Sequence, residues 1–134
     1  MTPEAASYLE KARQCLSNAR ANLGINLSND AGRNAYLAGF HAAQALIFER
    51  TGKAAKTHQG VQVEFNRLGK DDPRIDNHLR PFLSQAYILK AVADYETGPD
   101  SVIPPKRSAA AIETATQFID CIVDLIGESS KAHS

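Results

Sequence analysis

The chain is expected to be an all-α protein, an up-and-down bundle of four main helices with one extra short helix. Apolar residues recur at steps of three and four along several segments, which is the period of a helix that buries one face. No segment shows the strict alternation of apolar and polar residues that is typical of strands. The length of 134 residues fits one domain, residues 1–134, around a single core.

The first helix is expected to begin at Thr2 and Pro3, because threonine is a good cap and proline suits the first helical position. Its apolar seam follows at helical spacing through Ala5, Leu9, Ala12, Leu16, Ala19 and Leu23. Residues 24–29 carry the expected turn, in which Ser28 or Asn29 can cap the next helix.

The second helix is expected to run to about Arg50, where Thr51 and Gly52 stop it. Small residues form a stripe along one side of it: Ala31, Ala35, Ala38, Ala42 and Ala45. Large apolar side chains cover its other sides: Tyr36, Phe40, Ile47 and Phe48. Because small residues permit close approach, this helix is expected at the centre of the bundle or at the centre of a dimer.

A shorter third helix is expected to begin after Thr57, whose hydroxyl can cap it, and to reach about Leu68. Residues 69–73 have the composition of a loop. A helical piece is then expected to begin near Ile75, and Pro81 either kinks or restarts it.

The fourth main helix is expected to continue from this point to Gly98, and residues 99–105 form a second loop. The last helix should begin at residues 104–105 and end at Gly127. Residues 128–134 are expected to be a frayed tail, since chain ends order poorly unless something holds them.

Charge and composition limit the classes of function. Lys and Arg number 15, as do Asp and Glu, so the net charge is zero, which argues against strong, indiscriminate binding of nucleic acid. The balance is +4 over residues 33–70 and −4 from residue 94 to the end. A polarised surface is one interpretation of this asymmetry, and ordinary solvated helix faces are the other.

Neither a long apolar run nor a secretory signal is visible, so no membrane span is expected. Cys15 and Cys121 lie far apart in helical contexts and are expected to be reduced, mostly buried thiols. The histidines do not stand at metal-ligand spacing, and no glycine-rich phosphate loop is present. We therefore expect a cytoplasmic protein without a metal or other cofactor.

Polar side chains interrupt the apolar second helix at Arg33, Asn34 and His41. Burying such groups without partners costs free energy, so we expect each of them to have a hydrogen-bonding partner or a functional role. A second polar group, Lys56 to Gly60 with His58 inside it, follows the same helix. Together these residues suggest a site for a phosphate-bearing ligand, with RNA as the leading candidate.

The order of three short motifs resembles the HEPN family, especially its short single-domain prokaryotic members. The motifs are Phe40-His41-Ala42-Ala43, Lys56-Thr57-His58-Gln59-Gly60-Val61 and Ala93-Asp94-Tyr95. The resemblance extends from about Tyr8 to Ile126. It implies a helical bundle that forms a homodimer and, for active members, cleavage of RNA by an arginine and a histidine without a metal. It also implies a toxin–antitoxin pair, in which the partner is a small nucleotidyltransferase-type antitoxin.

The resemblance assigns catalytic roles to Arg33, Asn34 and His41, and substrate contacts to Lys56, His58 and Tyr95. His41 matches the family histidine directly, but seven residues separate it from Arg33, one more than the family pattern usually has. In the better register Asn34 takes the arginine position. On a helix, Asn34 lies about 20° from His41 in rotation, whereas Arg33 lies about 80° away.

The chemistry of such a pair needs no metal. A neutral imidazole can take a proton from a ribose 2′-hydroxyl near pH 7, since its ordinary pKa is about 6.5. A guanidinium can hold two phosphate oxygens and stabilise the charge that develops on them. The expected products are a 2′,3′-cyclic phosphate and a 5′-hydroxyl, with Asn34 orienting the phosphate or the histidine.

Plainer interpretations stay open for each residue. His41 can be a hydrogen-bonded core histidine, and Arg33 a surface residue in the first turn of its helix. His58 can bond a nearby carboxylate, and Tyr95 can pack in the bundle with its hydroxyl bonded across it. The alternative functions are a non-catalytic module that binds nucleotides or docks a nucleotidyltransferase, and a structural dimer whose polar residues only set the register.

Overall fold

A computed structural model describes residues 1–95, 97–98 and 101–132, with side chains described up to residue 127. Within these ranges the chain forms five helices and no strand, which confirms the predicted all-α class. The helices are α1 (Pro3–Gly24), α2 (Ser28–Thr51), α3 (His58–Gly69), α4 (Phe82–Tyr95) and α5 (Pro105–Ala132). None of the described helices is both long and apolar enough to span a bilayer.

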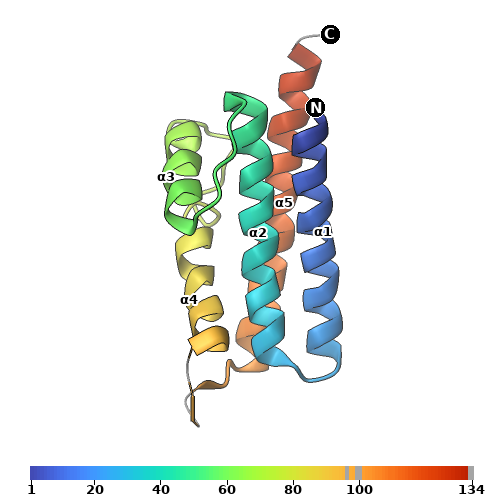
Figure 1. Cartoon of the computed structure of the whole chain (residues 1–134), viewed down its shortest axis with the longest axis vertical. Coiled ribbons are helices and arrows are strands. Elements are labelled where there is room, and N and C mark those ends of the chain that lie inside the picture. Colours follow the sequence, from blue (N-terminus) through green and yellow to red (C-terminus); the bar gives the residue numbers. More distant parts are fainter. Residues whose placement is uncertain (96, 99–100, 133–134) are drawn as a thin grey trace.

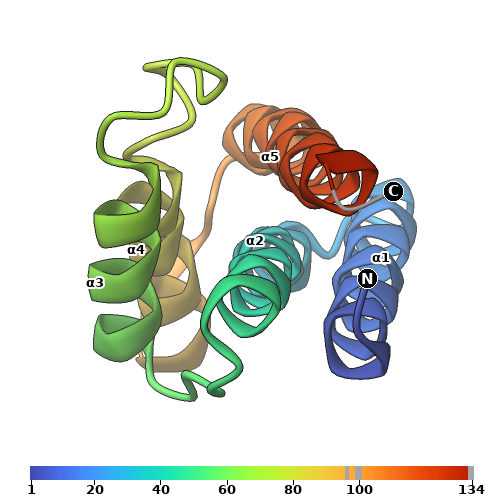
Figure 2. The same ribbon diagram turned by 90° about the horizontal axis from the view of Figure 1, so that it is seen from above.

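The long helices α1, α2 and α5 run side by side, and the two short helices α3 and α4 occupy the remaining side of the bundle (Figure 1). Seen from above, α2 lies between α1 on one side and α3 with α4 on the other, while α5 covers its back (Figure 2). Accordingly, α2 contacts each of the other four helices. The predicted central position of α2 is therefore correct.

The predicted start of α1 is also correct. The Ala5 amide donates to Thr2 Oγ1 over 3.1 Å, so the threonine caps the helix as its position after Met1 suggested. The Thr2 amide in turn donates to Glu49 Oε1 over 2.8 Å, which joins the beginning of α1 to the end of α2. The apolar seam of α1 faces the core at Ala5, Leu9, Ala12, Leu16 and Ala19.

Small residues allow α2 to approach its neighbours closely. The whole predicted alanine stripe is fully buried: Ala31, Ala35, Ala38, Ala42 and Ala45. Gly39 belongs to the same crowded surface, since a Cβ atom there would lie 2.3 Å from Cε2 of the buried Phe82 ring. Gly52 ends the helix in the left-handed region, with φ of 72°, as the predicted stop requires.

The predicted cap of α2 was wrong. The helix begins at Ser28 itself, and Leu27 stands at the cap position without a side-chain hydrogen bond. The Ser28 hydroxyl donates instead to the Ile103 carbonyl and lies 3.0 Å from Ser108 Oγ. Asn29 donates to the Ser101 carbonyl over 2.7 Å. Both side chains thus form hydrogen bonds with the connection between α4 and α5. Contacts with so distant a segment cannot be predicted from the local sequence.

The second half of the chain differs from prediction at three points. The stretch from Ile75 to Pro81 consists of turns rather than a helical piece, so α4 starts cleanly at Phe82. The α4 helix ends at Tyr95, before Gly98, where the backbone has a positive φ of 97°. The last helix continues past Gly127 to Ala132, because a glycine only weakens a helix by about 1 kcal/mol and does not by itself end it.

Candidate functional site

Arg33 lies in the first turns of α2 and points toward α4. Its Nε donates to Asp94 Oδ1 over 2.9 Å, and Lys90 Nζ donates to Asp94 Oδ2 over 2.7 Å. The hydrogen bond from Lys90 is the largest cause that holds the pKa of Asp94 below its usual range. Two cations thus share one carboxylate, and the group keeps one net positive charge. The Arg33 side chain remains 42% exposed.

Asn34 points the other way, toward α1. Its Nδ2 donates to Asn22 Oδ1 over 2.9 Å, so the amide is used to join α1 and α2. This places Asn34 and Arg33 on opposite flanks of the exposed side of α2. The structure therefore does not bring the three predicted catalytic residues into one tight cluster within a single protomer.

His41 is half-buried on α2, two turns beyond Arg33. Its Nδ1 lies 2.7 Å from Gln44 Oε1, and Gln44 Nε2 donates to the Ala55 carbonyl over 2.8 Å. Burial lowers the pKa of His41, the Gln44 hydrogen bond opposes this shift, and the positive charge of Lys11 on α1 adds to it. The imidazole is therefore neutral near pH 7, which is the form that can accept a proton.

His58, the first residue of α3, is bonded to a tyrosine and not to a carboxylate. Tyr36 Oη lies 2.7 Å from His58 Nδ1, and the His58 ring stacks on Tyr87 with centroids 3.9 Å apart. Burial lowers the pKa of His58 and also raises that of Tyr36. The interaction joins α2, α3 and α4, so this histidine has a clear structural task in the bundle.

Lys56 and Tyr95, the other predicted substrate contacts, are both at the surface. Lys56 is exposed just before Thr57, whose Oγ1 accepts from the Gly60 amide over 2.9 Å and caps α3 as predicted. Tyr95 is 75% exposed at the end of α4, so its interpretation as a packing residue was wrong. Its ring lies 5.7 Å from Lys90 Nζ. The tyrosine whose hydroxyl is bonded across the bundle is Tyr36.

Arg33 and His41 thus lie apart along α2. Arg33 joins Asp94, Lys90 and Tyr95 near one end of α2, whereas His41 lies farther along the helix. Eight residues of helix place their backbones about 12 Å apart along its axis. Sequence reasoning missed Gln44, whose only signal is its spacing of three residues from His41 within an apolar run.

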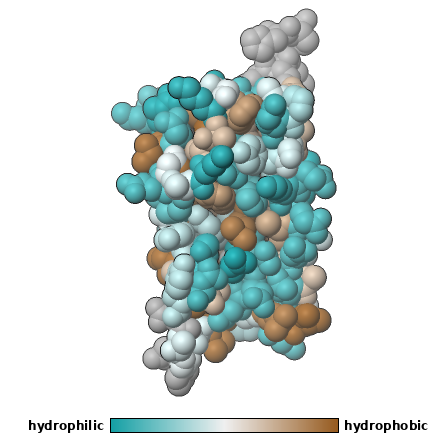
Figure 3. Space-filling model, viewed as in Figure 1, coloured by the Kyte–Doolittle hydropathy of each residue, from teal (hydrophilic) through white to brown (hydrophobic). Residues whose placement is uncertain are grey.

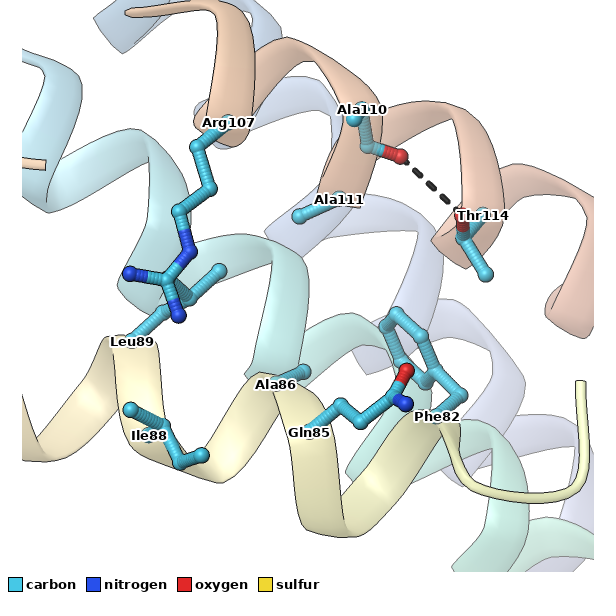
Figure 4. A pocket seen from close by; sticks show the side chains of 9 residues that line it. All are labelled: Phe82, Gln85, Ala86, Ile88, Leu89, Arg107, Ala110, Ala111 and Thr114. Atoms are coloured by element: carbon cyan, nitrogen blue, oxygen red, sulfur yellow. Dashed lines mark hydrogen bonds between the residues drawn. The ribbon is translucent and has the colours of Figure 1, made fainter. Parts of the chain in front are cut away.

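Four pockets formed by described residues contain none of the predicted site residues. A pocket between α4 and α5 has apolar walls, including Phe82, Leu89 and Ala111, with Arg107 at one end (Figure 4). It contains none of the predicted site residues. Among the described side chains, no group of three or more His, Cys, Asp or Glu is arranged to hold a metal ion.

The surface around α2 is mixed in character. On the side of the molecule seen in Figure 1, hydrophilic residues are interspersed with small, separate apolar patches (Figure 3). Such a surface suits a polar ligand or a partly polar partner better than a large apolar one. Along α2 itself, the Arg33 guanidinium and the His41 imidazole lie at different levels.

The fold and these residues define a class: a small helical bundle whose central helix presents a guanidinium and a neutral imidazole toward solvent. Comparison with known proteins identifies it. The family model of the HEPN domain matches residues 5–126, so the chain belongs to the HEPN family, as the resemblance of its motifs indicated.

Relatives of known sequence agree with this assignment. The chain is 26% identical over 125 residues to a UPF0332 protein of Thermotoga maritima, covering 93% of this chain and 92% of that protein. It is 28% identical over 125 residues to the "Putative toxin MJ0605" of Methanocaldococcus jannaschii, covering 93% and 90% respectively. Both matches span almost the whole domain.

A solved structure has the same fold. The crystal structure of TT1696 from Thermus thermophilus superposes with a TM-score of 0.79 and covers 92% of this chain and 98% of its own. At 20% sequence identity, this likeness concerns the fold alone.

Proposed function

We propose that the protein is a metal-independent endoribonuclease of the HEPN type. The observation that carries this proposal is that α2 carries both a half-buried neutral His41 and a partly exposed Arg33. Asp94 occupies only Nε of Arg33, and among the described residues no partner holds its two terminal nitrogens. Those nitrogens are the part of a guanidinium that binds phosphate in a bidentate manner.

The reaction is a displacement within the RNA itself. His41 Nε2 takes the proton of a 2′-hydroxyl, and the 2′ oxygen attacks the adjacent phosphorus. The bond from phosphorus to the 5′ oxygen breaks, and that oxygen takes a proton from water. The imidazolium later returns its proton to solvent. Arg33 stabilises the charge on the phosphate oxygens, and the products are a 2′,3′-cyclic phosphate and a 5′-hydroxyl.

A homodimer brings the two groups together better than one protomer does. Within one α2 helix, Arg33 and His41 are separated by about 12 Å along the axis. A two-fold axis that crosses α2 between them, near Leu37, reverses the partner helix. The partner's copy of Arg33 then lies at the level of His41. We therefore propose a cleft that receives the arginine from one subunit and the histidine from the other.

The biological role proposed is that of the toxin in a toxin–antitoxin pair, acting in the cytoplasm. The toxin name of the archaeal relative supports this role, and so does family membership. The partner proposed is an antitoxin of the nucleotidyltransferase type. Lys56, His58 and Tyr95 serve as secondary contacts to RNA, among which His58 has the least freedom because Tyr36 and Tyr87 hold its ring.

The test of catalysis is cleavage of labelled RNA in excess EDTA. The parent protein should cut, and His41→Ala should cut at least a hundredfold more slowly, since general base catalysis contributes about 10²–10⁴ in rate. His78→Ala is the matched control, because His78 is an exposed histidine bonded to Gln117 outside the site. Cleavage by His41→Ala at the parent rate, with unchanged helicity, disproves the catalytic assignment.

A second candidate function is a non-catalytic module that binds nucleotides or docks a nucleotidyltransferase. The observation that favours it is the position of Asn34 on the rotational face of His41, while Arg33 is bound to Asp94. This function predicts saturable nucleotide or protein binding by calorimetry, with RNA left intact under all conditions. Binding that is lost in Arg33→Ala but unchanged in His41→Ala would support it further.

A further inference from the structure

We infer that Gln44 is a positioning residue that holds His41 in one tautomer, with the proton on Nδ1 and the lone pair on Nε2. The catalytic role of Gln44 rests on the function proposed above, whereas the tautomer of His41 follows from the hydrogen bonds alone. Gln44 itself is 6% exposed in the middle of α2 and lies three residues beyond His41 on the same helix.

The orientation of the Gln44 amide follows from its second partner. The Ala55 carbonyl lies 2.8 Å from one end of the amide, and a carbonyl can only accept a hydrogen bond. The end that faces Ala55 must therefore be the NH₂ group. The reverse orientation would place two acceptor oxygens against each other in a buried site and leave the amide hydrogens misdirected.

The tautomer of His41 follows from the orientation of the amide. With Nε2 of Gln44 at Ala55, its Oε1 faces His41 Nδ1 over 2.7 Å. Because Oε1 is an acceptor, Nδ1 must carry the hydrogen. In the neutral ring the lone pair is then on Nε2, to which no described residue forms a hydrogen bond. That nitrogen is the one that a general base needs free.

The origin of this arrangement is the connection between α2 and α3. Residues 52–57 pass back along the side of α2 (Figure 1), and Ala55 of this connection packs against the core beside Gln44. The loop therefore supplies a fixed acceptor beside the helix. This acceptor orients the Gln44 amide, and the amide oxygen in turn fixes the proton on the imidazole. A polar side chain at this buried position thus serves the loop and the histidine at once.

The bond at His58 provides an internal contrast. Tyr36 is 2% exposed, and its hydroxyl has no other partner among the described residues, so its hydrogen must go to His58 Nδ1. The neutral His58 ring therefore carries its own hydrogen on Nε2. His41 on α2 and His58 on α3 are thus expected in opposite tautomers, and a single spectrum distinguishes them.

The experiment is a long-range ¹H–¹⁵N NMR correlation of ¹⁵N-labelled protein above the pKa of both histidines, which reports the protonated nitrogen of each ring. The parent should show His41 protonated on Nδ1 and His58 on Nε2. A His41 ring that is protonated on Nε2, or that exchanges evenly between both forms, overturns the inference. This measurement needs neither a variant nor RNA.

Two variants separate positioning from packing. Gln44→Met removes both hydrogen bonds at similar volume, so His41 should become a mixture of tautomers and cleavage should fall about tenfold, part of the rate that a general base contributes. Gln44→Glu keeps an acceptor for Nδ1, so the tautomer and most of the rate should be retained. Both variants lose the bond to Ala55, and the difference between them therefore isolates the acceptor.

The pH dependence gives a readout that packing alone does not move. Loss of the Gln44 hydrogen bond should lower the pKa of His41, so the acidic limb of the rate profile moves to lower pH in Gln44→Met. A carboxylate at position 44 should move that limb to higher pH. The inference is overturned if the acidic limb lies at the same pH in the parent and in both variants, or if the His41 tautomer is unchanged in Gln44→Met.

The control is Gln117→Leu, which removes the glutamine oxygen that lies 2.6 Å from His78 Nε2 on another side of the molecule. It should change the His78 signals and leave His41 and cleavage as in the parent. If His41→Ala cuts RNA normally while the parent shows the Nδ1–H tautomer, the nuclease proposal fails and the tautomer assignment remains valid.

Discussion

Asp94 decides how much positive charge Arg33 presents to a ligand. It binds Arg33 and Lys90 together, and its own side chain is 22% exposed. Partly exposed pairs of this kind contribute about 0–1 kcal/mol to stability, so the carboxylate is not needed to hold the fold. Its main effects are to fix the direction of the guanidinium and to cancel one of two positive charges.

Asp94→Asn should therefore change RNA binding more than stability. The variant gains one net positive charge beside Arg33, so its affinity for RNA should rise at low salt. The plot of log affinity against log salt should become steeper by up to about 0.7, the value for one further phosphate contact on a single strand. Fluorescence anisotropy at several salt concentrations measures this slope. An unchanged slope would show that RNA does not approach this cluster.

His41 on α2 and His58 on α3 should make the fold less stable in mild acid. The fold lowers the pKa of both His41 and His58 below the ordinary 6.5, chiefly through burial. A histidine whose pKa is lower in the folded than in the unfolded protein binds a proton less readily when folded. Its contribution to stability is therefore complete above pH 6.5 and is lost as the pH falls from there toward the folded pKa.

The thermal unfolding temperature of the parent should consequently fall between about pH 7 and pH 5. Asp94 and Asp72 contribute little in this window, since hydrogen bonds hold the pKa of Asp94 below its usual range and that of Asp72 at about 2. His58→Gln, which cannot take up the proton, should show a smaller fall across the same window. Equal falls for parent and variant would place the acid sensitivity elsewhere.

The α2 helix determines the compactness of the bundle through its small residues. Ala35, Ala38 and Ala42 are completely buried, and Gly39 lets the Phe82 ring of α4 approach the backbone. Side chains of this size leave no room for growth, because cores are packed to crystal-like density. The buried polar side chains of this helix, Ser28 and Gln44, are accordingly both hydrogen-bonded.

Gly39→Ala should destabilise the protein although alanine is the better helix former. A Cβ at position 39 would lie 2.3 Å and 2.9 Å from two atoms of the Phe82 ring, so a buried aromatic must shift. Such overpacking costs about 1–3 kcal/mol, against a gain of about 1 kcal/mol in helix propensity.

Gly127→Ala is the matched control for this change. Nothing lies within 4 Å of a Cβ at position 127 in α5, so only the propensity gain remains, about 0.5–1 kcal/mol of added stability. Urea unfolding of both variants measures the difference. A more stable Gly39→Ala would mean that α2 and α4 are not packed as closely as described.

At the level of the whole molecule, one protomer offers half of each proposed site. Because Arg33 and His41 are separated along α2, the hypothesis is that each cleft combines Arg33 of one copy with His41 of the other. Arg33→Ala and His41→Ala should each be inactive alone. Mixed in equal amounts after dissociation, they should recover about a quarter of the parent rate, because half of the dimers are mixed and carry one complete pair.

A site contained within one protomer predicts no recovery in this mixture, since neither chain then carries both groups. Sedimentation velocity at the concentrations of the assay supplies the control, because recovery requires dimers. A monomer that cuts RNA at the parent rate would exclude the shared cleft and leave the chemistry of His41 to be tested by itself.

Local patterns were sufficient for most of the fold. The Thr2 and Thr57 caps, the alanine stripe and the Gly52 stop were all predicted, since each depends on neighbours within a turn or two of the same helix. One failure concerns a residue whose partners lie far away in the chain. Ser28 bonds near residue 103 instead of capping its own helix, and no local pattern carries that information.

The candidate site divides in the same way. Sequence alone determined that Arg33, Asn34 and His41 lie on one helix and at what rotation from one another, because helix geometry follows from spacing. Only the tertiary structure decided that Asp94 holds Arg33, that Asn22 takes Asn34, and that Ala55 orients Gln44 toward His41. Each of these partners comes from another element, and packing alone determines which elements meet.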